Sequence, residues 1–247
     1  LIKGAGGCGK TTRLLNDPRL CNVVFSANSN ELCKSVDIPS FPHQHFSKQH
    51  RHLLNNKFKS ASVVIVDDVS TLNLQETKNI MDMCEGKLVI FIGDIGYQTP
   101  PIEKKGYTYE RHLNMFKHQI ELTKNYRFID LDHNKTCYEV RNMMKDGLKC
   151  NKILEYIKTR YLVVSKVDNL KRDDTFICAK KVFMKKYENQ LKEDFNVMKT
   201  IHSVQGKTIQ PPNKLFINLE GAWDETIIYT AISRAKTTEQ IVIVTNS

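Results

Sequence analysis

Short apolar runs rich in valine and isoleucine recur along the chain, separated by stretches whose apolar spacing is typical of helices. In Ser62-Val63-Val64-Ile65-Val66 nearly every position is apolar, which favours a parallel strand buried on both faces. The predicted strands are residues 1–3, 23–26, 63–66, 88–92, 120–122, 161–164, 176–178, 197–200, 215–218 and 241–244. The predicted helices are residues 10–15, 74–84, 132–145, 180–192 and 225–235. Such alternation predicts an α/β fold with mostly parallel sheets.

The strands fall into two consecutive series of similar length. A chain of 247 residues is long enough for two compact domains, each with its own core. We therefore predict one domain over residues 1–121 and a second over residues 122–247. No internal repeat and no low-complexity linker separates them.

The formal net charge is +10 and the sequence pI is near 9.2. A polyanionic partner is the usual reason for such a balance, and nucleic acid is the commonest polyanion. The alternative is a basic surface with no partner. Charge alone leaves both open.

Seven scattered cysteines, with no Cys-x-x-Cys pair, argue against a disulfide framework and a zinc finger and favour a reducing, intracellular compartment. The histidine cluster around residues 43–52 lacks cysteine or carboxylate at ligand spacing, so it is interpreted as a solvated basic segment rather than a metal site. No apolar run approaches the length of a membrane span. We expect the chain to be an excerpt of a longer protein.

The most specific motif is Gly4-Ala5-Gly6-Gly7-Cys8-Gly9-Lys10-Thr11, which fits G-x-x-x-x-G-K-[ST] between a short strand and a helix start. Its glycines let the backbone curl so that successive N–H groups face phosphate oxygens. Lys10 would contact the β- and γ-phosphates, and the Thr11 hydroxyl would be a Mg²⁺ ligand. The predicted ATP contacts are Gly4, Gly6, Gly7, Cys8, Gly9, Lys10, Thr11, Thr12 and Gly206.

Two acids, Asp67 and Asp68, end the buried strand at residues 63–66. In P-loop folds an acid at this strand end coordinates Mg²⁺ and a neighbour orients the attacking water, so Asp67 is predicted to bind Mg²⁺ and Asp68 to act in catalysis. The next strand ends at Gly93-Asp94, and Gln98 follows. An amide beyond a strand end can sense the γ-phosphate, although a polar turn would look the same.

Several further segments, in order, resemble the motifs of superfamily 1 helicases. The segment 93–101 looks like the third motif of that family, 122–127 like the fourth, 200–208 like the fifth and 229–235 like the sixth. Ser40-Phe41-Pro42-His43-Gln44-His45-Phe46 resembles a weaker Thr-x-His-x-Phe patch. The resemblance spans nearly the whole chain.

The resemblance implies two RecA-like domains that bind ATP and Mg²⁺ and carry single-stranded nucleic acid. It implies that Arg127 and Arg234 are arginine fingers and that Gln98 senses the γ-phosphate. The nucleic-acid contacts that it implies are His45, Phe46, Thr200, His202 and Gln205. Such contacts go mainly to phosphate and sugar, so little sequence would be read.

Two departures from the family pattern matter. Asp68 stands where the family usually has glutamate, which places the catalytic carboxylate one methylene further back. Only residues 192–198 separate the preceding helix from the fifth motif, where RecD- and Pif-type helicases usually carry a small β-barrel insertion. The chain therefore looks more like the compact helicases of viral replication proteins, which act in the cytoplasm or nucleus of the host cell.

These observations predict an ATP-dependent motor that moves on single-stranded DNA or RNA and separates duplexes at junctions, within a longer replication protein. A P-loop switch without unwinding activity, or an inactive helicase-like scaffold, stays open as an alternative. The motifs do not decide between DNA and RNA, because that choice depends on contacts to the 2′-hydroxyl.

Overall fold

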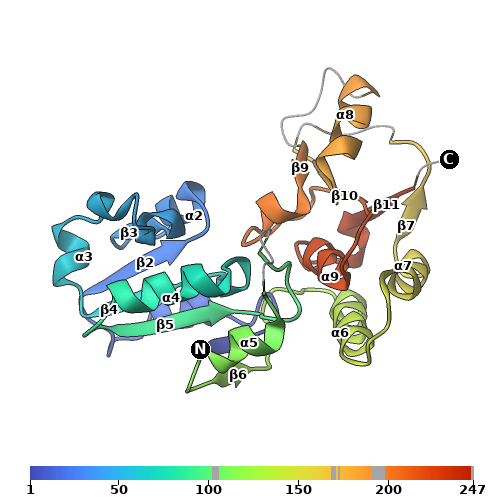
Figure 1. The fold of residues 1–247 in the computed structure, drawn as a ribbon. Helices are drawn as coiled ribbons and strands as arrows, with labels where there is room; N and C mark the ends of the chain where they lie inside the picture. Colours follow the sequence, from blue (N-terminus) through green and yellow to red (C-terminus); the bar gives the residue numbers. More distant parts are fainter. Residues whose placement is uncertain (102–105, 168–170, 172, 191–197, 246–247) are drawn as a thin grey trace. The chain divides into compact units, whose positions relative to one another are not determined.

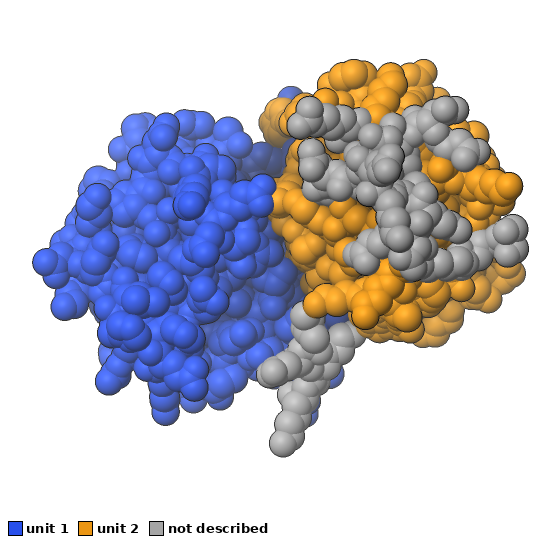
Figure 2. Space-filling view, turned by 90° about the horizontal axis from the view of Figure 1, so that it is seen from above, with its two compact units in different colours: residues 1–96, 100–125 blue, residues 97–99, 126–247 orange. Residues whose placement is uncertain are grey.

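The computed structural model describes residues 1–101, 106–167, 171, 173–190 and 198–245. Its internal contacts divide the chain into two compact units (Figure 2). The first unit is Leu1–Gly96 with Pro100–Asn125, and the second is Tyr97–Thr99 with Tyr126–Ser247. Compared with the predicted boundary after residue 121, residues 122–125 stay with the first unit and Tyr97–Thr99 join the second.

The first unit is built on a six-stranded sheet, all of whose paired strands are parallel, in the order β3-β2-β4-β5-β1-β6 (Figure 1). Its strands are β1 (Ile2–Gly4), β2 (Val23–Ala27), β3 (Ser40–Pro42), β4 (Val63–Val66), β5 (Leu88–Gly93) and β6 (Ile120–Leu122). The central strand β4 is buried at every residue, as its continuous apolar run predicts. Strand β3 was not predicted, because three residues ending in proline carry no alternation.

The helices of the first unit connect these strands. They are α1 (Lys10–Leu15), α2 (Asn30–Lys34), α3 (Asn56–Ser60), α4 (Leu74–Met83) and α5 (Tyr109–Asn114), with the 3-10 turns η1 (His43–Phe46), η2 (Arg51–Leu53) and η3 (Val69–Thr71). Helix α4 begins in a capping box, in which Asn73 accepts from the backbone of Glu76 and Glu76 accepts from the backbone of Asn73.

The second unit has a five-stranded parallel sheet in the order β7-β11-β10-β8-β9. Its strands are β7 (Leu162–Val164), β8 (Thr175–Cys178), β9 (Met198–Thr200), β10 (Leu215–Asn218) and β11 (Ile241–Val244). Its helices are α6 (Leu131–Lys145), α7 (Cys150–Lys158), α8 (Lys181–Gln190) and α9 (Glu225–Ile232), with η4 (Ile201–Val204) and η5 (Thr238–Gln240). The predicted α/β class with mostly parallel sheets is confirmed.

Helix α7 was not predicted. It buries Ile153 and Ile157 four residues apart, but its N-cap is Lys149, which makes no side-chain capping bond. The usual start signal is therefore missing from the sequence. The predicted strand residue 197, the predicted helix residues 191–192 and most of the short segment 192–198 lie outside the described residues.

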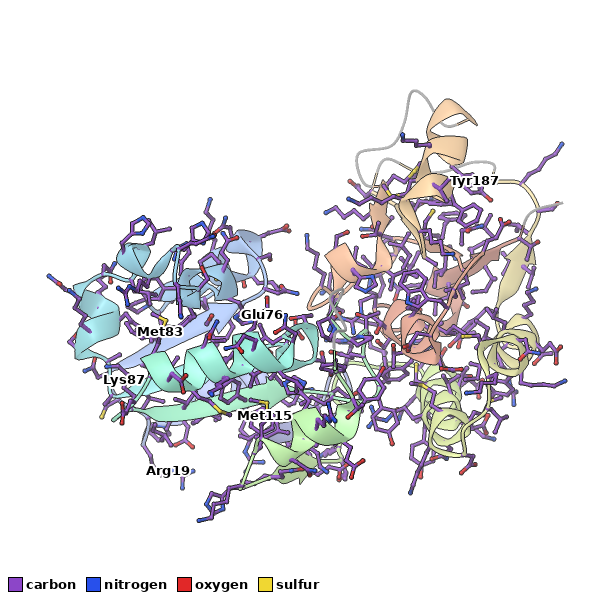
Figure 3. All side chains as sticks on the ribbon, viewed as in Figure 1. Arg19, Glu76, Met83, Lys87, Met115 and Tyr187 are labelled. Carbon is purple, nitrogen blue, oxygen red and sulfur yellow. The ribbon has the colours of Figure 1, made fainter. Side chains whose placement is uncertain are left out.

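Helix α8 is attached to the sheet through Tyr187, which is labelled in Figure 3. Its ring centroid lies 4.8 Å from that of Phe176 on β8, and its hydroxyl accepts from the Asn218 side chain on β10 at 3.2 Å. Across the described part of the chain, no helix combines the length and apolarity needed to cross a bilayer.

His112 of α5 is fully buried against α4. Thr77 donates its hydroxyl hydrogen to the Asn73 carbonyl, so His112 Nε2 donates to Thr77 Oγ1 at 2.9 Å. His112 Nδ1 then accepts from the Tyr107 hydroxyl at 3.1 Å. This pattern of bonds suits the neutral ring, and burial lowers the pKa of His112 to about 4.

We expect the free energy of unfolding to fall as the pH drops from 6.5 towards 4, because the unfolded chain binds this proton before the folded one does. The stability is complete above pH 6.5, and the full shift corresponds to about 3 kcal/mol. Urea unfolding at neutral and mildly acidic pH would measure it. His112→Gln should reduce the dependence, to which the buried His43 and His133 also contribute, and His118→Gln, at an exposed position, should leave it unchanged. Equal pH dependence in His112→Gln and the wild type would contradict the assignment.

Candidate nucleotide-binding site

The loop between β1 and α1 has the curled backbone that the motif predicts. Gly7 and Gly9 adopt left-handed conformations, with φ of 88° and 71°, and Gly9 is the N-cap of α1. At Gly4 a side chain would have no room, because its Cβ would lie 2.4 Å from the carbonyl oxygen of Leu122 on β6. The loop therefore requires glycine at these positions for two separate reasons.

Lys10 closes this loop. Its Nζ donates to the carbonyl oxygens of Gly4 and Ala5 at 2.8 and 2.9 Å. Burial lowers the pKa of Lys10, and the negative charges around it, led by Asp94, oppose that shift. The ammonium is thus held against the backbone of the predicted phosphate loop, where phosphate oxygens could replace its carbonyl partners.

Thr11 and Asp67 meet at the end of β4. Thr11 Oγ1 donates to Asp67 Oδ2 at 2.8 Å, and the backbone N–H of Asp68 donates to Asp67 Oδ1 at the same distance. Burial and the charge of Asp68 raise the pKa of Asp67. A hydroxyl beside a carboxylate is an oxygen donor set that suits Mg²⁺, which takes few protein ligands and completes its shell with water and phosphate. Among the described residues no group of three or more His, Cys, Asp or Glu could hold a metal.

Asp68 has a left-handed backbone, with φ of 50°, and its side chain is buried. Its carbonyl accepts from the backbone and the hydroxyl of Thr71 at 2.9 and 2.8 Å, which fixes the turn η3. Gly93 of β5 makes room for this turn, because a Cβ there would lie 2.8 Å from Cγ1 of Val69. The Asp68 carboxylate is thereby held near Lys10, and its catalytic role stays a prediction.

Three neighbouring residues were missed as site residues. Asp94, at the end of β5, is 2% exposed and is the leading negative charge acting on Lys10. The Asn125 side chain donates to the Gly6 carbonyl at 2.7 Å, so it supports the phosphate loop. The strand ending at Asp94 was visible in the sequence, whereas the bond from Asn125 spans 119 positions and leaves no local signal.

His43 is the third. Its Nε2 lies 2.8 Å from the carbonyl oxygen of Asp67, which can only accept, so Nε2 donates. Nδ1 therefore accepts from Ser26 Oγ, also at 2.8 Å. Burial lowers the pKa of His43 to about 4, which keeps the ring neutral. His43 thus ties β2 and η1 to the backbone of the predicted Mg²⁺ ligand.

Of the predicted nucleic-acid contacts at residues 45 and 46, Phe46 needs a correction, and His45 stays a prediction. Phe46 is 2% exposed, and its ring packs edge-on against Phe58 with centroids 5.4 Å apart, so it belongs to the hydrophobic core and presents no surface for a base. His45 is partly exposed and lies tilted against Phe41. In the segment 40–46, the motif position of Phe46 therefore reflects packing in the core around η1.

Both predicted arginine fingers lie at the C-terminal end of α9. Arg234 is 1% exposed and donates to the carbonyls of Thr230 and Lys207 at 2.9 and 3.2 Å and to Ser233 Oγ at 2.9 Å. Arg127 donates to the Ser233 carbonyl at 2.9 Å. Cations are favourable at this end of a helix, where carbonyls lack helical partners. Within the second unit both arginines hold this turn, and their action on nucleotide stays a prediction.

Gln98 is buried in a polar cluster of the second unit. Gln205 donates to Gln98 Oε1 at 3.3 Å and accepts from the Thr99 hydroxyl, and the Thr99 backbone N–H donates to Thr230 Oγ1 at 2.9 Å. The preceding Tyr97 packs under the Arg141 guanidinium, 3.7 Å from its ring centroid. The third, fifth and sixth motif segments therefore meet in one network, which includes the unpredicted Thr99 and Thr230.

The remaining predicted residues lie nearer the surface. Thr200 is the N-cap of η4 and accepts from the Ser203 backbone at 3.4 Å. His202 is partly exposed on η4, so it is not a core histidine. Gly206 is left-handed, with φ of 82°, and Thr12 is exposed on α1.

A family model of the viral superfamily 1 RNA helicase core domain matches residues 1–245. No curated protein matches the sequence. The Pif1 helicase from Bacteroides, in complex with ADP-AlF3 and single-stranded DNA, is 16% identical with a TM-score of 0.68, over 98% of this chain and 87% of that one. Pif1 from Candida albicans is 11% identical with a TM-score of 0.68, over 100% and 91%. The arterivirus nonstructural protein 10 helicase with DNA is 16% identical with a TM-score of 0.59, over 99% and 60%. At these identities the structures establish a common fold.

Proposed function

Since this chain belongs to the viral superfamily 1 RNA helicase core family, we propose that it hydrolyses ATP with Mg²⁺ to move along single-stranded nucleic acid and separate duplexes at junctions. The observation that carries the proposal is the Thr11–Asp67 pair, 2.8 Å apart, beside the partly buried ammonium of Lys10 on the phosphate loop. A P-loop switch uses the same hydroxyl, carboxylate and lysine. The second parallel-sheet unit and the family match over residues 1–245 favour a helicase over a switch.

Each residue of the site has a definite task in this proposal. Lys10 transfers its hydrogen bonds from the loop carbonyls to the β- and γ-phosphates. Thr11 and Asp67 would hold Mg²⁺, which neutralises charge on the phosphate oxygens when bound. Asp68 orients the attacking water and accepts its proton, and its short side chain sets it further back than a glutamate would. Asn125 and His43 position the loop and the Asp67 backbone.

The setting of this activity is also part of the proposal. The net charge of +10 suits a polyanionic track. The Bacteroides Pif1 structure named above contains ADP-AlF3 and single-stranded DNA, which supports a nucleotide-driven activity on one strand. The scattered cysteines form no Cys-x-x-Cys pair, and we propose a reducing intracellular compartment such as the host cytoplasm or nucleus. We place the chain in viral replication, joined to other domains of a longer protein.

Tailed DNA and RNA duplexes, each with either a 5′ or a 3′ single-stranded tail, provide the test. We expect ATP hydrolysis to be stimulated by single strands and unwinding to occur with one tail polarity only. Both should weaken steeply as salt rises, because backbone contacts release counterions. Asp67→Asn keeps the shape of the side chain but removes its charge, so it is the matched inactive control. Absence of both stimulation and unwinding in the wild type would favour a switch or scaffold.

A further inference from the structure

An exposed aromatic and cationic cluster lies in the second unit, outside the nucleotide site. Trp223 is 51% exposed. The His202 ring stacks on it, with centroids 6.0 Å apart and planes 12° from parallel, and Lys180 Nζ lies 5.7 Å from its ring centroid. We propose that Trp223, supported by His202 and flanked by Lys180, is a stacking platform for a base of the single strand. This inference rests on the proposed function and assigns a contact within it.

The sheet topology brings these three residues together. Lys180 follows β8, His202 follows β9 and Trp223 follows β10, and these strands are neighbours in the parallel sheet (Figure 1). They end in register, because Cys178 pairs with Asn218 on one side and Thr200 on the other. In open parallel sheets, ligands bind outside the carboxyl ends of the strands. The cluster therefore lies where this fold presents ligand contacts.

The local backbone holds the platform in place. Gly221 has φ of 68°, and a Cβ there would lie 3.1 Å from Lys180 Nζ and 3.2 Å from Phe183. Glycine therefore allows the Lys180 side chain to lie against the turn that carries Trp223. Asp224, which follows Trp223, is the N-cap of α9, and its carboxylate accepts a hydrogen bond from the backbone N–H of Thr226 at 3.0 Å. The Trp223 ring thus stands at one end of α9, and Arg234 follows the other end.

The chemistry of the cluster fits a base and its phosphate. Because the His202 ring already fixes the orientation of Trp223, the indole loses little conformational entropy when a base stacks on it. Any base can stack, since every base has a flat aromatic face. The Lys180 ammonium, which lies over the Trp223 ring, suits the phosphate next to the stacked base. An exposed tryptophan can also anchor a protein partner. The neighbouring lysine and the net charge of +10 favour nucleic acid.

Trp223 is the single tryptophan of the chain, so its fluorescence reports on this position without a label. Titration with a short oligothymidylate or oligouridylate should quench the emission. An abasic oligonucleotide of the same length offers the same phosphates without bases, and it should bind more weakly and leave the emission nearly unchanged.

Substitutions separate stacking from charge. Trp223→Ala should weaken binding of an end-labelled oligonucleotide about tenfold, Trp223→Phe should recover part of the loss, and the salt dependence should keep its slope. Lys180→Ala should instead reduce that slope by about 0.7, the value for one phosphate contact on a single strand. Tyr138→Ala removes an exposed aromatic from α6 and should leave binding unchanged.

The outcomes distinguish this inference from the proposed function. If the wild type binds single strands and hydrolyses ATP, but Trp223→Ala binds equally and the emission is unchanged by oligonucleotide, the platform is overturned and the helicase proposal stands. If the wild type neither binds single strands nor responds to them in ATP hydrolysis, both proposals fail. Thermal unfolding monitored by circular dichroism should give the same midpoint for Trp223→Ala and Tyr138→Ala.

Discussion

Replacing Lys10 with alanine is expected to lower strand-stimulated ATP hydrolysis by about 10²- to 10³-fold, the effect of removing one preorganised electrostatic donor. The ammonium lies on the phosphate loop, bound to the carbonyls of Gly4 and Ala5, with the charge of Asp94 acting on it. No other residue of the loop carries a positive charge. Steady-state hydrolysis with saturating single-stranded DNA or RNA, together with the KM for ATP, would measure the loss.

The control for this change is Lys3→Ala. Lys3 lies on β1 just before the same loop, and its Nζ is 3.7 Å from Glu121 in a partly exposed pair, which contributes little to stability. Hydrolysis by Lys3→Ala should match the wild type. A normal rate in Lys10→Ala would refute the assignment of the phosphate loop, provided that the circular dichroism spectra of the two variants agree.

Replacing Arg234 with alanine should produce the second large effect, a loss of about 10³- to 10⁵-fold in the rate of hydrolysis, as for an arginine finger. It should also lower the free energy of unfolding by about 1 to 3 kcal/mol, because the carbonyls of Thr230 and Lys207 each lose one donor. Urea unfolding and hydrolysis at a temperature well below the midpoint would separate the two effects.

Arg234→Lys helps to separate the loss of catalysis from the loss of stability. Lysine keeps the charge but cannot donate in three directions from one plane, so it should restore stability in part and the rate only slightly. Arg160→Ala is the control, since Arg160 pairs with Glu139 at 3.7 Å near the surface. A fully folded Arg234→Ala that hydrolyses ATP at the wild-type rate would mean that Arg234 serves only to hold the end of α9.

The fold was largely predictable because its strands are central and parallel. Burial on both faces requires a continuous apolar run, and such a run is visible in β4, β10 and β11. Elements that depend on their neighbours were missed. Strand β3 exists through pairing with β2, and α7 folds without a capping side chain because Ile153 and Ile157 have a core to enter.

The same division applies to the site. Lys10 and Thr11 are set by local spacing, and Asp67 by its place at the end of a buried strand, so the sequence carries their signal. The bonds of Asn125 to Gly6 and of Thr99 to Thr230 join residues more than a hundred positions apart. Phe46 was assigned to a surface because its motif resembles a binding patch, but only packing against Phe58 reveals that its ring is buried.

Residues Tyr97–Thr99 have a consequence for how this chain can be divided. The backbone passes between the two units after Gly96, after Thr99 and again after Asn125. Cutting after Asn125 would give a second fragment without the groups that pair with Thr230, Gln205 and Arg141. A chimaera that exchanges the second unit between related helicases must therefore carry Tyr97–Thr99 along with it. The second unit is complete only when residues 97–99 accompany residues 126–247.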